Sequence, residues 1–293
     1  MTFSIVAVDK DKKDLGVAVA SKFIAVGSAV PWVKIGVGAV ATQAWANLRL
    51  GPLILYLLEN NYSPKRAVET LLSIDERREH RQVGVVNARG EAYAYTGSKC
   101  IEYAGHIAGD GYSVQGNILT GGEVLESMAK AYETTKGELV DKLLAALKAG
   151  DEAGGDKRGK QSAAIIVLRS CGGYGGCLEG VDRYVDLRVD DHPDPVNELT
   201  RLFKLWELTI LEREDPSDVV DLSEVALEIQ EALAILGYYK GDVSGEINRE
   251  TIEALTEWMA INNFENKMRS DGKLWGSIYR YLLEQAKSVK KRY

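Results

Sequence analysis

The residue after the first methionine is a threonine, whose hydroxyl is a candidate nucleophile. Methionine aminopeptidases generally remove Met1 when the second residue is as small as Thr2. The freed α-amine has a reference pKa of about 8, so it can take the hydroxyl proton as a general base. Thr2 also opens a β-branched, apolar run and suits an ordinary place on an edge strand. The sequence therefore supports two interpretations, amide-bond chemistry at Thr2 or a purely structural threonine.

A glycine and an asparagine form a second candidate, between a strand pattern and a helix pattern. Gln115, Gly116 and Asn117 follow the strand, and the helix begins near Glu123. Such a turn can present an amide donor and backbone N–H groups to a developing anion. Asparagine is equally common where a turn needs a left-handed backbone. Asn117 is thus either an oxyanion donor or a turn residue.

The cysteines, histidines and clustered acids give weaker candidates. Cys171 and Cys177 flank a glycine-rich loop, and we favour two free thiols over a disulfide between them. Cys100 and His106 make a catalytic dyad only if they touch, which their spacing does not ensure. Helix capping is the favoured role of the acidic run 190–194, ahead of a cation site. With only three histidines in the chain, we expect no metal ion and no cofactor.

Charge and hydropathy exclude several classes of protein. Lys and Arg total 36 against 43 for Asp and Glu, a formal charge of -7, which argues against a nucleic-acid partner. No apolar run approaches the roughly 18 residues of a membrane span, so no membrane partner is expected. The first residues lack the basic and apolar regions of a secretory signal, and we expect a cytoplasmic protein.

The positions of these residues depend on the elements around them. The patterns predict four strands, two helices, four strands, two helices, two strands and one helix, and the first strands are expected at 3–9, 15–20, 25–30 and 34–42. Neighbouring strands joined by short turns indicate antiparallel sheets rather than βαβ units. We therefore expect an α+β fold with two sheets and helices outside them.

A charged, proline-containing segment suggests a domain boundary. We expect a large domain over 1–212, a linker over 213–221 and a helical domain over 222–293. The last of these contains Leu227–Gly241 (a helix ending Leu-Gly-Tyr-Tyr), Thr251–Leu255 and Asp271–Gly276. These motifs resemble the peptidoglycan-binding-like three-helix domain. The resemblance implies a recruitment module with a glycan or peptide ligand, held by any aromatic side chain that the core leaves exposed.

The first two hundred residues carry five further motifs, at 2–7, 16–22, 36–43, 114–119 and 187–195. They resemble the domain of unknown function ten-twenty-eight, a family placed among proteasome-like N-terminal nucleophile hydrolases. The resemblance implies a four-layer αββα sandwich, which agrees with the order of elements. It does not supply a substrate. Relatives commonly assemble, and the apolar helix expected at 197–212 adds to the expectation of a homo-oligomer.

The resemblance also assigns roles around Thr2. Lys34 would lower the pKa of the nucleophile and support charge, or be a solvated lysine at a strand end. Gly38 would offer a backbone N–H to the oxyanion. Asp156 and Ser162 would support the nucleophile, or lie in a plain loop. Ser21 stands where the proteasome family has an acidic residue.

Together these assignments give one hypothesis and one rival. The hypothesis is an N-terminal nucleophile amidohydrolase that cleaves an unknown amide, with a recruitment module appended. The rival is a non-catalytic binding or scaffold protein that retains the αββα fold.

Overall fold

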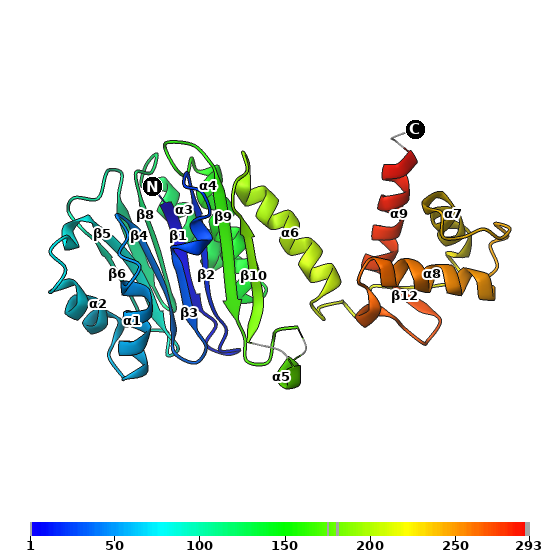
Figure 1. Ribbon diagram of the computed structural model, residues 1–293, viewed down its shortest axis with the longest axis horizontal. Helices are drawn as coiled ribbons and strands as arrows, with labels where there is room; N and C mark the ends of the chain where they lie inside the picture. The colour runs from blue at the N-terminus through cyan, green and yellow to red at the C-terminus, as the bar shows by residue number, and fades with distance from the viewer. Residues whose placement is uncertain (1, 175, 180–181, 291–293) are drawn as a thin grey trace. The chain divides into compact units, whose positions relative to one another are not determined.

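The computed structural model describes residues 2–174, 176–179 and 182–290 and divides the chain into two compact units, 1–202 and 203–293 (Figure 1). The expected α+β fold class is confirmed. Within the described residues, no helix is long and apolar enough to cross a membrane.

Two antiparallel sheets form the centre of the first unit. The larger sheet has the order β10-β9-β2-β1-β8-β7 and the smaller the order β3-β4-β5-β6. The strands of the larger sheet are β1 (Thr2–Val8), β2 (Leu15–Ser21), β7 (Gly105–Gly109), β8 (Tyr112–Asn117), β9 (Ser162–Leu168) and β10 (Arg183–Val189). Those of the smaller sheet are β3 (Pro31–Lys34), β4 (Gly38–Ala44), β5 (Arg81–Asn87) and β6 (Ala92–Thr96).

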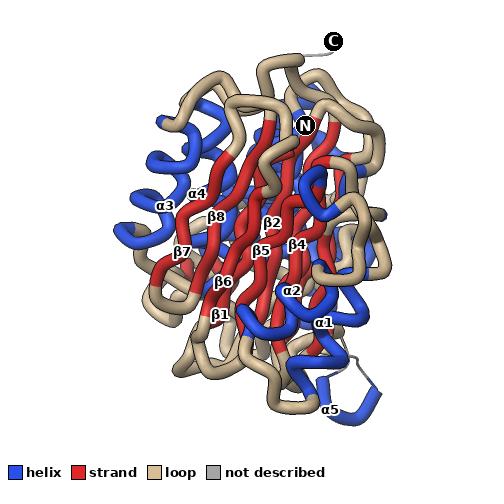
Figure 2. Tube along the Cα trace, turned by 90° about the vertical axis from the view of Figure 1, so that its left-hand side faces the viewer, coloured by secondary structure: helices blue, strands red, loops and turns tan. Residues whose placement is uncertain are grey.

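Helices cover the outer face of each sheet. The larger sheet carries α3 (Glu123–Thr134) and α4 (Leu139–Glu152), and the smaller carries α1 (Leu50–Glu59) and α2 (Pro64–Leu72) (Figure 2). The remaining helical segments are two 3-10 turns (Val26–Ser28 and Arg78–His80), α5 (Gly176–Glu179) and α6 (Pro195–Thr209). The expected αββα sandwich is therefore confirmed.

Strand alternation decides what fills the space between the sheets. On β1, Val6 and Val8 face the smaller sheet and pack with Ala39 and Ala41 of β4, and all are buried. Phe3 points the other way, against Gly150 of α4. Because side chains alternate across a strand, Thr2 and Ser4 share the inner face with Val6 and Val8.

One expected strand is wrong. The segment 25–30 is a loop around a 3-10 turn, in which Ala25 has a left-handed φ of 52°. Val26 and Val30 are nevertheless buried in the core between the sheets. The apolar pattern that suggested a strand reflects the burial of these residues, and a loop can bury apolar side chains as well as a strand can.

The second unit contains α7 (Ala226–Leu236), α8 (Arg249–Ile261) and α9 (Gly276–Lys290), close to the three expected helices. It also holds a 3-10 turn (Glu265–Lys267) and two short paired strands, β11 (Val219–Asp221) and β12 (Lys273–Trp275). The second unit spans 203–293, and Leu208 packs on its core. Part of the expected linker is β11.

The aromatic side chains of the second unit mainly build its core. Trp258 and Tyr239 are buried. The other four singled out by the sequence are half-buried: Tyr238, Trp275, Tyr279 and Tyr281. None of the six is therefore left fully exposed for stacking on a sugar ring.

Candidate active site at the start of the central strand

Thr2 lies at the beginning of β1, between the end of β2 and the end of β8. It is buried, with 6% of its surface exposed. Its Oγ1 lies 3.1 Å from Oγ of Ser21, the last residue of β2. On the other side, Thr2 is the register partner of Asn117, the last residue of β8. Thr2 and two of the polar residues singled out in the sequence therefore meet at one end of the sandwich.

Asn117 has a hydrogen-bonding role that the sequence did not reveal. Its Nδ2 donates to Oε1 of Gln82 over 2.8 Å, and the side chain is buried. A primary amide carries two N–H hydrogens, and this bond uses one. Asn117 belongs to β8, and the left-handed residue of the turn is its neighbour Ile118, with a φ of 51°. The bond to Gln82 holds the amide beside Thr2.

Three glutamines on three strands form a buried network next to Thr2. Gln43 of β4 donates through Nε2 to Oε1 of Gln82 on β5 over 2.9 Å, and its Oε1 accepts from Oγ of Ser4 over 2.6 Å. Gln115 of β8 donates to Ser4 Oγ over 2.6 Å. The Nε2 of Gln43 also lies 3.3 Å from the backbone oxygen of Thr2. The network thus connects both sheets to the backbone of the candidate nucleophile.

The role of these glutamines was not predicted, although the sequence carries a signal for it. Gln43 follows Ala39 and Ala41 at the same inward-facing alternation of β4, where an apolar residue would be expected. Gly84 of β5 makes room for Gln115, because a Cβ there would lie 1.9 Å from the Gln115 Oε1. A polar residue on the buried face of a strand, opposite a glycine, is the pattern to look for.

Asp156 and Ser162 hold the loop after β2 rather than touching Thr2. The Asp156 carboxylate accepts from the backbone N–H of Lys22 over 2.7 Å and is 7% exposed. Ser162 accepts from the N–H of Val26 over 3.1 Å and donates to the carbonyl of Phe23. Both therefore fix the chain that leaves Ser21, as positioning residues.

The structure does not bring Lys34 and Gly38 to Thr2, so the roles expected for them are corrected. They pair with each other at the far end of β3 and β4, and Lys34 forms an exposed ion pair with Glu59 at 2.7 Å. Gln43, the β4 residue beside Thr2, lies five positions further along the strand, a separation of about 16 Å. Counting residues from Thr2 could not show that Lys34 closes an antiparallel turn at the opposite edge.

Comparison with known proteins places the large unit in a family. Residues 2–199 match the family of unknown function DUF1028. The chain belongs to the DUF1028 family. The crystal structure of a DUF1028 protein from Silicibacter pomeroyi is 31% identical, with a TM-score of 0.64, covering 70% of this chain and 86% of that one. Residues 209–282 match the family described as "Putative peptidoglycan binding domain".

Other comparisons add less. The BPH protein from Thiobacillus denitrificans is 14% identical with a TM-score of 0.37, covering 58% of this chain and 98% of that one. Its complex with epoxomicin gives a TM-score of 0.34 at the same identity and coverage. No curated protein matches the sequence.

Thr2 lines neither of two cavities in the DUF1028 unit. A cavity of about 440 Å³ lies by α1 and α2, lined among others by Leu50, Ile74 and Arg81. A much smaller one, of about 70 Å³, lies beside Ser21 and Asp156.

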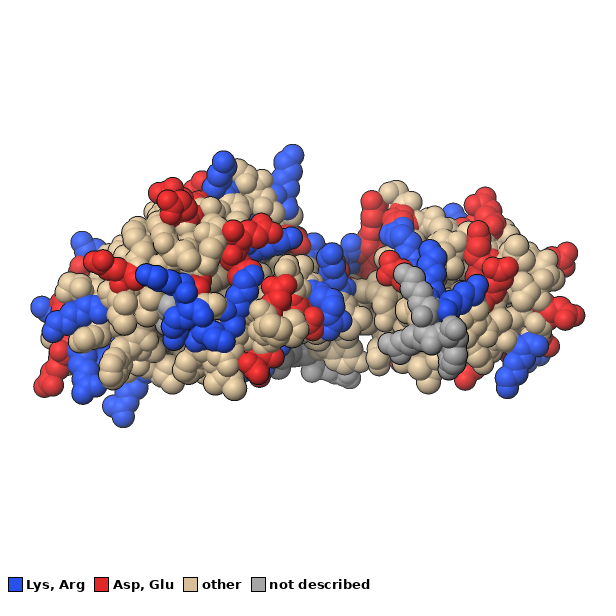
Figure 3. Space-filling model, turned by 90° about the horizontal axis from the view of Figure 1, so that it is seen from above, with Lys and Arg blue, Asp and Glu red and all other residues tan. Residues whose placement is uncertain are grey.

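The face of the DUF1028 unit at this end carries several cations (Figure 3). Lys22, Lys157, Arg158 and Lys160 are all exposed and surround the buried Asp156. The Lys22 ammonium donates to the backbone oxygen of Lys160 over 3.3 Å. Four basic residues thus lie in the chain segments next to the candidate site, and two of them are paired with acidic side chains.

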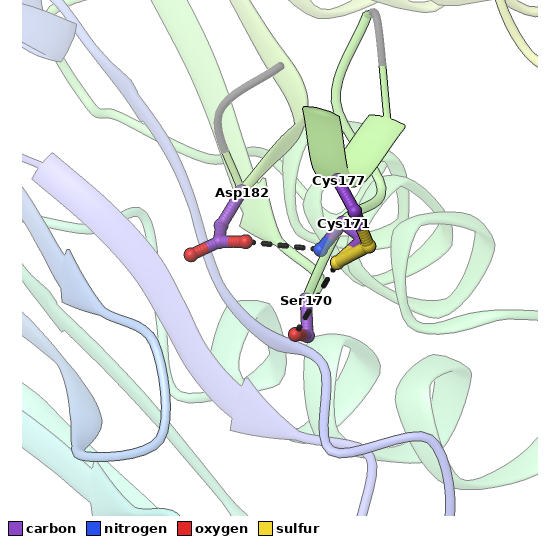
Figure 4. Close-up of a disulfide and its surroundings, with 4 residues drawn as sticks. All are labelled: Ser170, Cys171, Cys177 and Asp182. Atoms are coloured by element: carbon purple, nitrogen blue, oxygen red, sulfur yellow. Dashed lines mark hydrogen bonds between the residues drawn. A yellow bond between two sulfur atoms is a disulfide. The ribbon is translucent and has the colours of Figure 1, made fainter. Parts of the chain in front are cut away.

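The remaining candidates of the sequence lie elsewhere. Cys171 and Cys177 form a disulfide, so the favoured interpretation of two free thiols is wrong (Figure 4). The thiol of Cys100 lies 3.4 Å from the backbone oxygen of Arg81, and burial raises its pKa. His106 instead lies with Nδ1 2.9 Å from Thr96 Oγ1, so the structure gives no support for a Cys–His dyad.

The acidic run 190–194 leads into a helix. Asp194 precedes α6, its backbone oxygen accepts from the N–H of Glu198 over 3.1 Å, and its carboxylate accepts from Asn197 over 2.8 Å. The hydrogen bond from Asn197 lowers the pKa of Asp194. Among the described residues, no group of three or more metal-binding side chains is present.

Proposed function

We propose that this DUF1028 protein is an N-terminal nucleophile amidohydrolase, with Thr2 as the nucleophile after removal of Met1. The supporting observation is the position of Thr2 at the start of the central strand, 3.1 Å from Ser21 and paired with Asn117. A hydroxyl held by a rigid strand is placed for attack with little loss of conformational freedom. The substrate is an amide.

The reaction follows from the groups at hand. The Thr2 oxygen bonds to the amide carbonyl carbon as its proton passes to the α-amine. The second N–H of Asn117 stabilises the negative charge on the carbonyl oxygen. The ammonium then donates its proton to the leaving nitrogen as the C–N bond breaks, which leaves an ester on Thr2. Water attacks this ester as the α-amine takes one proton from the water. The ester C–O bond then breaks, the ammonium returns the proton to the Thr2 oxygen, and the acid is released.

Ser21 changes the proton chemistry from that of the proteasome family. A serine hydroxyl is not a base near neutral pH, so Ser21 can orient the Thr2 oxygen but cannot take its proton. The α-amine must therefore be the base. A free Thr2 amine is consequently a strict requirement of this proposal.

Intact-mass spectrometry and acylation by a β-lactone test the proposal. The wild-type protein is expected to lack Met1 and to gain one lactone mass on the N-terminal peptide. Thr2→Ala keeps a small second residue, so Met1 is still removed, and the acylation rate is expected to fall by at least about a thousandfold. Thr2→Ser should retain labelling. Met1 present on all molecules, or equal labelling of Thr2→Ala, would refute the mechanism and leave the non-catalytic rival.

For the second unit we propose recruitment to a peptidoglycan-type glycan or peptide, supported by its family match. A cavity of about 260 Å³ in this unit is lined by charged and polar side chains that include Glu207, Arg213 and Asp218. Such a lining favours a polar ligand over a ligand that is held by aromatic stacking. Co-sedimentation of the full chain with purified peptidoglycan is the direct test. Self-association of the chain stays a prediction.

A further inference from the structure

Two cations flank the candidate nucleophile on opposite sides. Lys22 directly follows Ser21, the neighbour of Thr2 on β2. On the β8 side, the backbone N–H of Lys157 donates to the carbonyl of Ile118 over 3.2 Å, and Ile118 directly follows Asn117. Both lysine side chains are exposed. The chain segments that carry Lys22 and Lys157 therefore lie on the two sides of Thr2.

The cations next to Lys22 and Lys157 form ion pairs with acidic side chains, whereas Lys22 and Lys157 form none within the described part of the chain. Arg158 lies 3.4 Å from the Asp156 carboxylate, and Lys160 forms an ion pair with Asp151 at 2.6 Å. Among the described residues, neither Lys22 nor Lys157 forms an ion pair with an acidic side chain. An anionic group arriving from solution would thus meet uncompensated charge at these two positions.

The charge of these two lysines is opposite to the net charge of the whole chain. The protein has a formal net charge of -7, and Lys and Arg lie among Asp and Glu on the face where β1 begins (Figure 3). A small positive area on an acidic protein attracts a compact anion but repels a long polyanion. An ammonium group acts as a point charge, which suits a single carboxylate.

We propose that the substrate of the Thr2 site is an amide that carries a carboxylate close to the bond to be cleaved, held by Lys22 and Lys157. An acylated amino acid and a peptide cleaved near its C-terminus or near an acidic residue share this chemistry. The inference rests on the proposed function for its site, and it adds the class of substrate.

Exposed apolar side chains complete the same surface. Phe23 follows Lys22 and is 53% exposed, and Ile101, whose carbonyl accepts from Ile118, is 64% exposed. The chain on each side of Thr2 thus carries an exposed lysine and an exposed apolar residue. An anionic substrate with an apolar acyl part would contact both kinds of group.

A matched pair of β-lactones, one bearing a carboxylate and the other the corresponding carboxamide, tests the proposal on the full chain. The wild-type protein should be acylated faster by the carboxylate probe, by about tenfold at low salt, and the preference should shrink as salt is added. Lys22→Gln and Lys157→Gln should each reduce the rate with the carboxylate probe about threefold to fivefold and leave the carboxamide rate unchanged. Lys65→Gln on α2 is the matched control and should change neither rate. Equal rates for the two probes in the wild-type protein would overturn the proposal.

A binding measurement separates this inference from the proposed function. If neither lactone acylates Thr2, the proposed function fails, and calorimetry with N-acetyl-alanyl-alanine and its C-terminal amide then decides the inference. Binding of the acid alone, weakened in Lys22→Gln and Lys157→Gln, would support a carboxylate site without catalysis. Equal binding of the acid and the amide, or no binding of either compound, would overturn the inference of a carboxylate site.

Discussion

The space between the two sheets is filled differently at its two ends. Where β1 ends, Val6 and Val8 pack against Ala39, Ala41 and their apolar neighbours, all of them buried. Where β1 begins, the same inward-facing positions of the strands carry hydroxyl and amide groups: Thr2, Ser4, Gln43, Gln82, Gln115 and Asn117. We call these the apolar end and the polar end.

The difference shows what each end contributes. Apolar packing is non-directional and accepts other side chains of similar volume. A buried amide network has few allowed arrangements, because each unpaired donor or acceptor costs about 1–3 kcal/mol. The apolar end therefore stabilises the fold, while the polar end specifies where Thr2 and Asn117 lie.

The largest effect on stability is expected from removing the central amide of the polar end. Gln82 accepts from Gln43 and Asn117 and donates to the backbone oxygen of Gly116 over 2.7 Å. Gln82→Leu removes the hydrogen bonds that these buried groups make to Gln82, so we expect a loss of about 3–5 kcal/mol. Val86→Ala at the apolar end of the same strand should cost about 2 kcal/mol. Urea unfolding measures both, and an equal or smaller loss for Gln82→Leu would contradict the assigned roles.

Much of the fold follows from the sequence, and part of the site does. Apolar alternation and turns are local, so they predicted the order of the elements and the two sheets with helices outside them. The pairing of Thr2 with Asn117 is a finding of the structure. The network of Gln43, Gln82 and Gln115 depends on which strands become neighbours across the two sheets, which local patterns do not contain. The expected position of Lys34 beside Thr2 was wrong for the same reason, since its distance from Thr2 depends on strand direction.

A second expected effect is a dependence of stability on pH at the polar end. Arg81, the first residue of β5, binds Asp75 through two hydrogen bonds of 3.0 and 3.1 Å. These bonds lower the pKa of Asp75 from 3.8 to about 2. Because the folded-state pKa is depressed, the stabilisation is complete above about pH 4 and is lost as the pH falls towards 2.

Asp75→Asn tests this contribution. The shift corresponds to about 2 kcal/mol, so wild type should lose that amount of unfolding free energy between pH 5 and pH 2 through this group. The variant should lack this component and be less stable at pH 7. Urea unfolding of both proteins at several pH values gives the comparison. Parallel pH profiles would show that the Asp75–Arg81 pair does not contribute.

The smallest expected effects come from two alanines on β4 that should respond to glycine in opposite directions. Ala41 is buried at the apolar end, so Ala41→Gly loses a packed methyl group and adds freedom to the unfolded chain, costing about 1–2 kcal/mol.

Ala44, next to Gln43, has a φ of 64°, a left-handed conformation that costs a non-glycine residue about 1 kcal/mol or more. Relief of that strain exceeds the added entropy, so Ala44→Gly should stabilise the fold by up to about 0.5 kcal/mol. Thermal unfolding of the two variants gives the sign of each change in unfolding free energy. If both substitutions destabilise the fold, the backbone at Ala44 is not strained.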